Sequence, residues 1–211
     1  MKNKIFVIGF NKTATSTFHQ LFLANKKKSQ HGGIWKTQNY DCFSDNPELP
    51  ENNYKNLYKK YPDAKFILNT RSLNSWLLSR AVHCEALKQS WGYPLTDKLL
   101  TEWIDRRNEK HLEIINFFKD KPNKLIIVNI ENDGWINFIK KEFNFKTDLT
   151  KKYNTAKKIN KNKIDNFQKM IEKTFINKKI PKEYYEDKFL DFSISKDSNI
   201  QNLINLYKNN L

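Results

Sequence analysis

The first 25 residues constrain the fold most, because they predict a strand, a tight loop and a helix in immediate succession. Residues 4–9 (KIFVIG) form a short apolar run that ends in Gly, which is the pattern of a buried parallel strand. After the loop FNKTA, residues 15–25 (TSTFHQLFLAN) carry apolar side chains at helical spacing. This order is typical of the first βα unit of a nucleotide-binding α/β fold.

The loop itself, residues 9–17 (GFNKTATST), has the composition of an anion-binding loop. Backbone N–H groups at a helix start point outward unpaired, and the helix dipole adds partial positive charge there. Lys12 contributes a full charge. Hydroxyl donors are supplied by Thr13, Thr15, Ser16 and Thr17.

The spacing of this loop differs from that of a Walker A motif, which places four residues between its first Gly and a Gly-Lys pair. Here Lys12 comes three residues after Gly9, and the residue directly before it is Asn11 rather than Gly. The sequence therefore disfavours a P-loop kinase or NTPase that depends on Mg²⁺. An ordinary N-capped helix after a loop stays open as the alternative, since Thr and Ser are common caps.

The rest of the chain continues the alternation of strands and helices. Apolar runs predict two further strands, at residues 65–70 and 124–130. Helical patterns predict four further helices, at residues 53–61, 73–89, 97–118 and 133–143. This order predicts an α/β fold with a P-loop NTPase-like parallel sheet flanked by helices. We expect residues 1–146 to form this core.

Beyond residue 146 the chain becomes rich in Lys and Asn, and it contains no Gly after Gly134. Short helical patterns occur near residues 164–175 and 200–211. We expect residues 147–211 to form a small helical C-terminal extension packed on the core.

Composition narrows the function only in part. The formal net charge of +15 favours anionic partners, but only four of the 38 basic residues are Arg, and a codon bias toward A and T is the alternative explanation for the excess of Lys and Asn. Cys42 and Cys84 are too few for a disulfide framework and too isolated for a zinc site, so we expect two buried thiols and no metal. No apolar run reaches the length of a membrane span, which predicts a soluble, intracellular protein.

A second motif follows the strand at 65–70. Arg71 closes that strand (KFILNT), and Ser79 follows eight residues later on the next helix. The guanidinium fork of Arg matches phosphate geometry, and Ser adds a hydroxyl donor about two turns along. Both side chains can converge on one phosphate at the carboxyl edge of the sheet, where open α/β folds bind their ligands.

The two motifs together resemble the sulfotransferase superfamily. Its 5′-phosphosulfate loop typically reads P-K-[ST]-G-T-[ST], which residues 11–16 (NKTATS) match, and its 3′-phosphate motif has Arg and Ser at the spacing seen here. The stretches YDCFSD-P-EL, YPDAKFILNTRS-SWLLS and LIIVNI-DGWINFI also resemble the small P-loop sulfotransferases of bacteria, algae and large viruses. The resemblance covers roughly residues 4–146.

This resemblance implies an enzyme that moves a sulfuryl group from 3′-phosphoadenylyl sulfate (PAPS) to an acceptor and releases adenosine 3′,5′-bisphosphate (PAP). Lys12 is then a catalytic residue that stabilises charge on the leaving phosphate. Arg71 and Ser79 select the 3′-phosphate. The complete donor site implied is Asn11, Lys12, Thr13, Ala14, Thr15, Ser16, Thr17, Arg71 and Ser79.

Three positions depart from the family pattern. Ala14 replaces the usual Gly, so we expect this backbone position to avoid a Gly-only conformation. Thr17 stands where cytosolic members carry an adenine-stacking Trp, so Phe18 or another aromatic has to serve, or stacking is weaker. The basic, Gly-containing loop that binds the 3′-phosphate near the C-terminus is absent, and Lys157, Lys158 or Lys161 are the candidates to replace it.

The catalytic base comes, by the resemblance, from the segment between the first helix and the Arg strand. His31 is the first candidate because of its suitable pKa, and Asp41 and Asp45 are the next. The remaining histidines, on predicted helices, are expected to be packing or surface residues: His19, His83 and His111.

The acceptor stays open among a glycan, a lipid, a small molecule and a protein, and nucleic acid is not among the partners we expect for the enzyme. The alternative to an enzyme is a sulfotransferase-like module that binds polyanions without catalysis.

Overall fold

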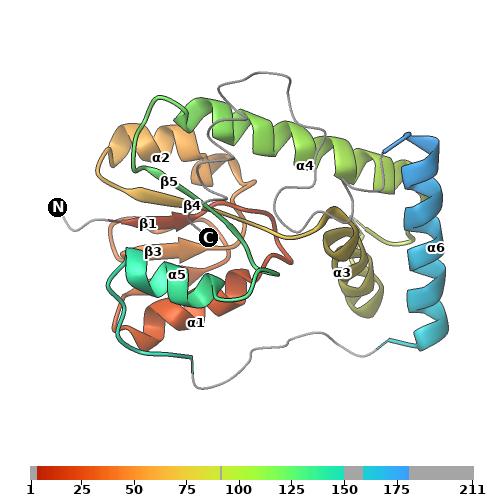
Figure 1. Cartoon of the computed structure of the whole chain (residues 1–211), viewed down its shortest axis with the longest axis horizontal. Helices are drawn as coiled ribbons and strands as arrows, with labels where there is room; N and C mark the ends of the chain where they lie inside the picture. The colour runs from red at the N-terminus through yellow and green to blue at the C-terminus, as the bar shows by residue number, and fades with distance from the viewer. Residues whose placement is uncertain (1–3, 91, 150–158, 181–211) are drawn as a thin grey trace.

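The structure, a computed structural model, describes residues 4–90, 92–149 and 159–180. Its centre is a sheet of five strands in the order β2-β3-β1-β4-β5, and every neighbouring pair is parallel (Figure 1). The strands are β1 (Ile5–Val7), β2 (Ser29–His31), β3 (Cys42–Ser44), β4 (Lys65–Thr70) and β5 (Leu125–Asn129). The α/β fold with a parallel sheet, predicted from the sequence, is confirmed.

Helices connect and cover these strands close to the predicted positions. They are α1 (Thr15–Ala24), α2 (Tyr54–Lys60), α3 (Leu73–Leu87), α4 (Asp97–Phe118), α5 (Trp135–Glu142) and α6 (Lys161–Asn177), with a 3₁₀ turn at Pro50–Asn52. The helix predicted near 200–211 lies outside the described residues. No helix in the described part of the chain is both long and apolar enough to cross a bilayer.

Strands β2 and β3 were not predicted. Each has three residues, and β2 has the polar sequence SQH, so neither gives a periodic signal. Their pairing makes them strands, because β3 lies beside β1 and β2 extends the sheet by one edge position. This matters for the site, since β2 and β3 deliver His31 and Ser44 to the carboxyl edge.

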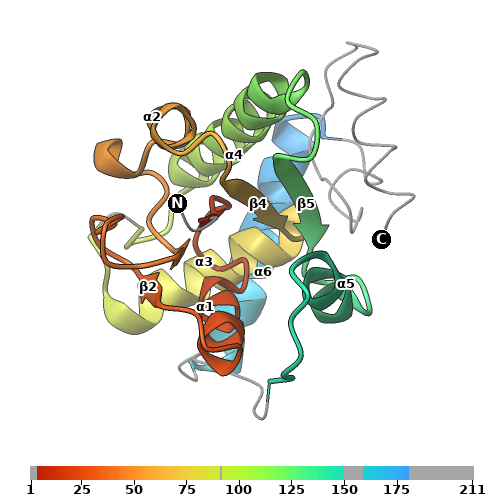
Figure 2. The same ribbon diagram turned by 90° about the vertical axis from the view of Figure 1, so that its left-hand side faces the viewer.

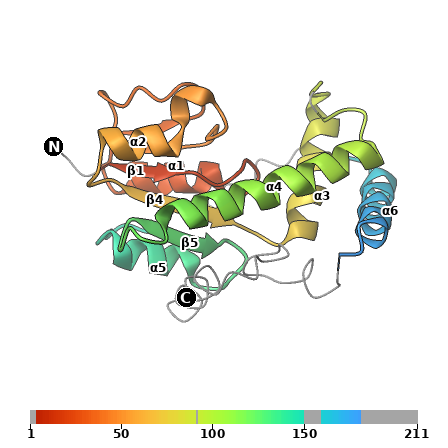
Figure 3. The same ribbon diagram turned by 90° about the horizontal axis from the view of Figure 1, so that it is seen from above.

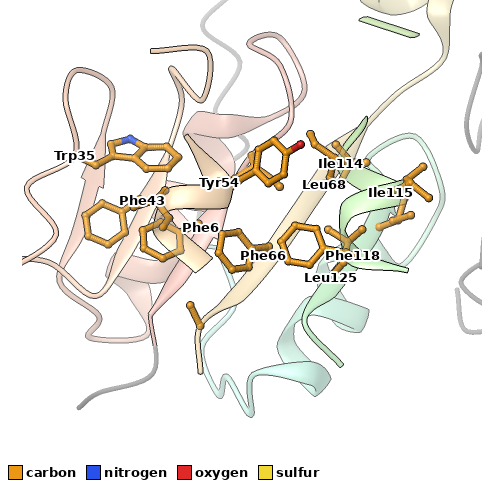
Figure 4. Close-up of a cluster of buried hydrophobic side chains, with 14 residues drawn as sticks. Phe6, Trp35, Phe43, Tyr54, Phe66, Leu68, Ile114, Ile115, Phe118 and Leu125 are labelled. Atoms are coloured by element: carbon orange, nitrogen blue, oxygen red, sulfur yellow. The ribbon is translucent and has the colours of Figure 1, made fainter. Parts of the chain in front are cut away.

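Helices cover both faces of the sheet. One face carries Phe6, Phe66 and Leu125, which pack with residues of α2 and α4 such as Tyr54 and Phe118 (Figure 4). The opposite face packs against α1 and α5, which lie together on one side of the sheet (Figure 2). Successive strand residues alternate between the two clusters, as the period of two in a β-strand requires.

A third cluster lies beyond the carboxyl ends of the strands. There α3, the first half of α4 and α6 pack together, and Phe10 of the loop after β1 inserts among them (Figures 1 and 3). Ile171 and Phe175 are the buried residues of α6 in this cluster. Helix α3 therefore stands as a wall opposite the strand ends, and α6 supports it from outside.

The buried faces of α3 and α4 include polar side chains, which the helical spacing of apolar residues does not indicate. On α3, Leu87 is exposed and Val82 only half-buried, whereas Arg80 and Cys84 are buried. On α4, Arg107 and His111 are buried on the inner face, although they are polar. The burial of the Arg107 guanidinium is compensated by hydrogen bonds, because its Nη2 donates to the Arg71 carbonyl oxygen at 2.7 Å and to Thr70 Oγ1 at 3.1 Å.

Gly9 occupies a place where no larger residue fits. A Cβ at this position would lie 2.0 Å from the Asn69 carbonyl oxygen and 2.4 Å from Asn69 Oδ1. Backbone atoms of β4 cannot move out of the way without breaking the pairing with β1. The close approach of two strands explains the Gly that ends the first apolar run.

Gly9→Ala is expected to lower the free energy of unfolding by about 3 kcal/mol, the upper end of the usual cost of overpacking, because the clash involves the backbone of the central sheet. Gly33→Ala is the matched control: its φ is +63°, no atom lies within 4 Å of a Cβ there, and only the left-handed strain of about 1 kcal/mol applies. Urea unfolding of both variants measures the difference. Equal losses would contradict the close-approach explanation.

Candidate functional site

The strand order places a topological switch point between β1 and β4. After β1 the chain turns toward β3 and β2, and after β4 it turns toward β5, so the two connections diverge. Open α/β sheets bind ligands at such a switch point, outside the carboxyl ends of the strands. The loop that carries Lys12 and the residue Arg71 lie here, and Arg71 Nη1 donates to the Lys12 carbonyl oxygen at 3.3 Å.

The loop after β1 is held by Asn69, a buried residue of β4. Asn69 Oδ1 accepts from the Gly9 N–H at 2.9 Å, while its Nδ2 donates to the Thr13 carbonyl oxygen at 2.6 Å. The Thr13 hydroxyl is also used inside the protein, by Asn69 Nδ2 and the Phe10 carbonyl oxygen. Thr13 therefore shapes the loop, and its hydroxyl is directed inward rather than toward a ligand.

Asn69 was missed in the sequence, although a signal was present. It is a polar residue that directly follows the apolar run Phe66–Leu68 of β4, and a buried amide there needs several hydrogen-bond partners.

The loop backbone is left-handed at two residues. Lys12 has a φ of 67° and Ala14 a φ of 63°. Ala14 was expected to avoid a Gly-only conformation, and its φ of 63° and ψ of 28° lie in the left-handed region, which L-residues reach at a cost. Ala therefore accepts strain at this position of the loop.

Helix α1 begins at Thr15 with no side chain capping its first turn. In the described part of the chain, no acceptor meets the N–H groups of residues 14–17. Together with the helix dipole these N–H groups favour an anion at the loop. The Asn11 side chain does not cap the start of α1. Its Oδ1 accepts from Arg80 Nη1 and its carbonyl oxygen accepts from Trp76 Nε1, and these two hydrogen bonds attach the loop to α3.

Arg71 is held in place by Glu131, which follows β5. The guanidinium Nη2 and the carboxylate Oε1 are 3.1 Å apart, and Oε2 accepts from the Ser72 N–H at 2.9 Å. Burial raises the pKa of Glu131, but hydrogen bonds from Ser72 and Ser75 together with Arg71 outweigh burial and hold the pKa below its ordinary value. Glu131 was not found from the sequence, since no local pattern pairs it with Arg71.

Ser79 shares a face of α3 with two residues that contact the groups at the switch point. Ser75, Ser79 and His83 recur every four residues and so share one face of the helix. Ser75 interacts with the Glu131 carboxylate at one end of this row, and His83 Nδ1 lies 3.5 Å from Lys12 Nζ at the other. Ser79 therefore stands between Glu131 and Lys12, on the wall opposite the loop.

A hollow of about 450 Å³ opens beside Glu131 and is lined by residues 130–137 with Asp148 and Leu149. Trp135, at the start of α5, is half-buried in its wall, and its ring packs on Phe18 with centroids 5.0 Å apart. Phe18 is fully buried between Trp135 and Phe22. Phe18 therefore cannot stack on an adenine, contrary to the first suggestion from the sequence, whereas Trp135 borders open space.

On the other side of the loop, β2 and β3 bring His31 and Asp45 next to α1. His31 Nε2 lies 3.3 Å from Ser16 Oγ and 3.9 Å from Asp45 Oδ2, and His31 Nδ1 lies 3.0 Å from Ser44 Oγ. Asp41 is separated from this group, since it precedes β3 and so lies at the amino edge of the parallel sheet. Its position offers no contact with the loop.

Lys12 sits between these two sides. Burial lowers the pKa of its ammonium group and the Arg71 charge adds to this effect, while Asp45 and Cys84 act in the opposite direction.

Cys42 and Cys84 are both buried free thiols, as predicted. Of the Lys residues considered for a second 3′-phosphate contact, Lys161 begins α6 and is exposed, while Lys157 and Lys158 lie outside the described residues.

Among residues 4–90, 92–149 and 159–180, no group of three or more His, Cys, Asp or Glu side chains is placed to hold a metal ion.

A family model described as "Sulfotransferase domain" matches residues 36–196, well over half of the chain. The match includes Arg71 and Ser79 and starts after the Lys12 loop. A comparison with curated proteins finds no match.

Glu131→Gln is expected to make the free energy of unfolding less dependent on pH at acid pH. The pKa of Glu131 is lower in the folded protein than its ordinary value, so the carboxylate stabilises the fold above about pH 4.5 and this contribution is lost as the pH falls further. The free energy of unfolding between about pH 5 and pH 3 should therefore change less in the variant. Glu102→Gln, on the exposed surface of α4, is the control for the loss of a carboxylate elsewhere. If the free energy of unfolding of Glu131→Gln fell as steeply with falling pH as that of the wild type, the pairing of Glu131 with Arg71 would be contradicted.

Proposed function

This chain belongs to the sulfotransferase domain family, and on that premise we propose that it transfers a sulfuryl group from PAPS to a hydroxyl or amine acceptor and releases PAP. The observation that carries the proposal is the juxtaposition of Lys12, the uncapped start of α1 and Arg71 at one switch point. These groups supply positive charge at two places, as a donor with phosphates on both the 5′ and 3′ positions requires.

The 5′-phosphosulfate binds along the loop in this proposal. The N–H groups of Ala14, Thr15, Ser16 and Thr17 surround it, and the Ser16 and Thr17 hydroxyls add donors at the helix start. Lys12 stabilises the negative charge that develops on the leaving phosphate oxygen. Asn11 and Thr13 act by fixing the loop, since their side chains are bonded to α3 and β4.

The 3′-phosphate binds at Arg71 and Ser79. Three of the five guanidinium N–H groups of Arg71 are used by Glu131 and the Lys12 carbonyl oxygen, which fix the plane of the fork. A phosphate takes the remaining N–H groups or displaces Glu131. In either case Glu131 sets the orientation of Arg71 before the donor arrives, so the ordering of this side chain is already complete.

The adenine ring enters the hollow beside Glu131 and stacks on Trp135. Thr17 has no aromatic ring, and Trp135 presents one from α5 at the open side of Phe18. Stacking of a base on an aromatic side chain contributes about 1–3 kcal/mol. The nucleoside therefore extends over β4 and β5, while the sulfuryl group points toward β3 and β2.

Arg71→Ala is expected to weaken PAP binding about 10- to 100-fold, the usual effect of losing hydrogen bonds to a charged group. Binding of adenosine 5′-phosphate, which lacks the 3′-phosphate, should change far less. Calorimetry with both nucleotides measures the difference, and Arg106→Ala, an exposed Arg paired with Glu48, is the matched control.

In the wild type, PAP should bind more tightly than ATP in the same experiment. Equal or absent binding of the two nucleotides would overturn the proposed donor. Steeply salt-dependent binding of heparin that survives Lys12→Ala would favour a polyanion-binding module instead.

Trp135→Leu keeps an apolar contact with Phe18 but removes the stacking surface. We expect it to weaken PAP binding at least about fivefold, and to leave the weak binding of pyrophosphate at the loop unchanged. Competition calorimetry with the two ligands separates these effects. An equal loss for pyrophosphate would show that Trp135 acts on the loop rather than on the base.

A further inference from the structure

The Lys12 ammonium group has a partner on α3 that the family pattern does not suggest. His83 Nδ1 on α3 lies 3.5 Å from Lys12 Nζ. An ammonium group has only donors, so the nitrogen that faces it is the one with a lone pair. This partner assigns the neutral tautomer of His83, with its hydrogen on Nε2.

Resting on the function proposed above, we propose that His83 is the catalytic base that takes the proton of the sulfuryl acceptor, and that Lys12 occupies its Nδ1 lone pair until the donor binds. When a phosphosulfate draws Lys12 to its bridging oxygen, Nδ1 becomes available to the acceptor. Proton acceptance is thereby coupled to the presence of the donor.

The charges around His83 keep it neutral. Burial lowers the pKa of His83, the adjacent Lys12 ammonium and Arg80 of α3 lower it further, and Asp45 from the end of β3 acts in the opposite direction. A neutral imidazole near physiological pH is the form that accepts a proton. Phosphate and sulfate charges reverse the balance, because they favour the imidazolium that forms during transfer.

The transfer step balances with these groups alone. The acceptor oxygen attacks sulfur while its proton passes to His83 Nδ1, and the bond between sulfur and the 5′-phosphate oxygen breaks in line. Lys12 stabilises the oxygen that leaves with the bond electrons. The imidazolium then returns its proton to water after the products depart.

The geometry favours His83 over the bases expected from the sequence. Both ring nitrogens of His31 face hydroxyl groups, Ser44 Oγ and Ser16 Oγ, and its ring stacks on that of His19 with centroids 5.4 Å apart. These contacts fix His31 as a bridge between β2, β3 and α1. Asp45 lies beside His31 and acts electrostatically on Lys12 and His83, which suits a residue that orients the site.

Proton uptake on ligand binding tests the coupling without an acceptor. Calorimetric titration with PAP in two buffers of different ionisation enthalpy, near pH 6.5, gives the number of protons bound. We expect fractional uptake in the wild type and none in His83→Asn, whose amide oxygen still accepts from Lys12 but does not titrate. His19→Asn, another half-buried histidine next to the site, is the matched control and should keep the uptake.

Hydrolysis of PAPS, with water as the acceptor, tests the catalytic role. His83→Asn should lower the rate at least about 100-fold and remove the acid limb of its pH profile, the usual effect of losing a general base. A rate within about threefold of the wild type with the acid limb kept, or loss of that limb in His31→Asn instead, would overturn the assignment.

The two proposals fail in distinguishable ways. PAP binding with proton uptake unchanged in His83→Asn would overturn the role of His83 alone. Absence of PAP binding in the wild type would overturn the proposed function and the assignment of His83 together.

Discussion

The site depends on one buried carboxamide, that of Asn69. It joins the start and the end of the loop after β1, because it accepts from the Gly9 N–H and donates to the Thr13 carbonyl oxygen. These bonds hold the loop against β4 at a distance that only Gly tolerates, and they maintain the left-handed residues Lys12 and Ala14 between them. Without this clamp, neither the start of α1 nor the Lys12 side chain has a fixed direction.

The strand order then divides the carboxyl edge into two sides. To one side of the loop, β4 and β5 present Arg71 and Glu131, with the hollow at Trp135 beyond them. To the other side, β3 and β2 present Asp45 and His31. Helix α3 spans both sides as a wall, with Ser75 at the first and His83 at the second. In the proposed function, nucleoside recognition and proton transfer are therefore separated by the central strand, and Lys12 lies at the boundary between them.

Much of the fold was predictable because its long elements carry strong periodic patterns. Helix α4 begins and ends where its pattern does, and the apolar runs of β1, β4 and β5 are found as strands. The short strands β2 and β3 were missed because three residues contain no period, and only pairing, of β3 with β1 and of β2 with β3, makes them part of the sheet. The Arg107 side chain was missed as a buried residue for a related reason, since Thr70 Oγ1 and the carbonyl oxygen of Arg71, which accept from it, lie on an element far away in the sequence.

The sequence by itself determined the loop with Lys12, the position of Arg71 after a strand, and Ser79 at a fixed distance along the next helix. Each of these is a local feature, and local spacing is visible in one dimension. Only the tertiary structure decided the partners: Glu131 for Arg71, Asn69 for the loop and His83 for Lys12. These pairs are separated by about 60 residues or more and depend on strand order and helix orientation, which arise from the packing of all elements at once. For the same physical reason Asp41 and Asp45, four residues apart in the chain, come to lie at opposite edges of the sheet.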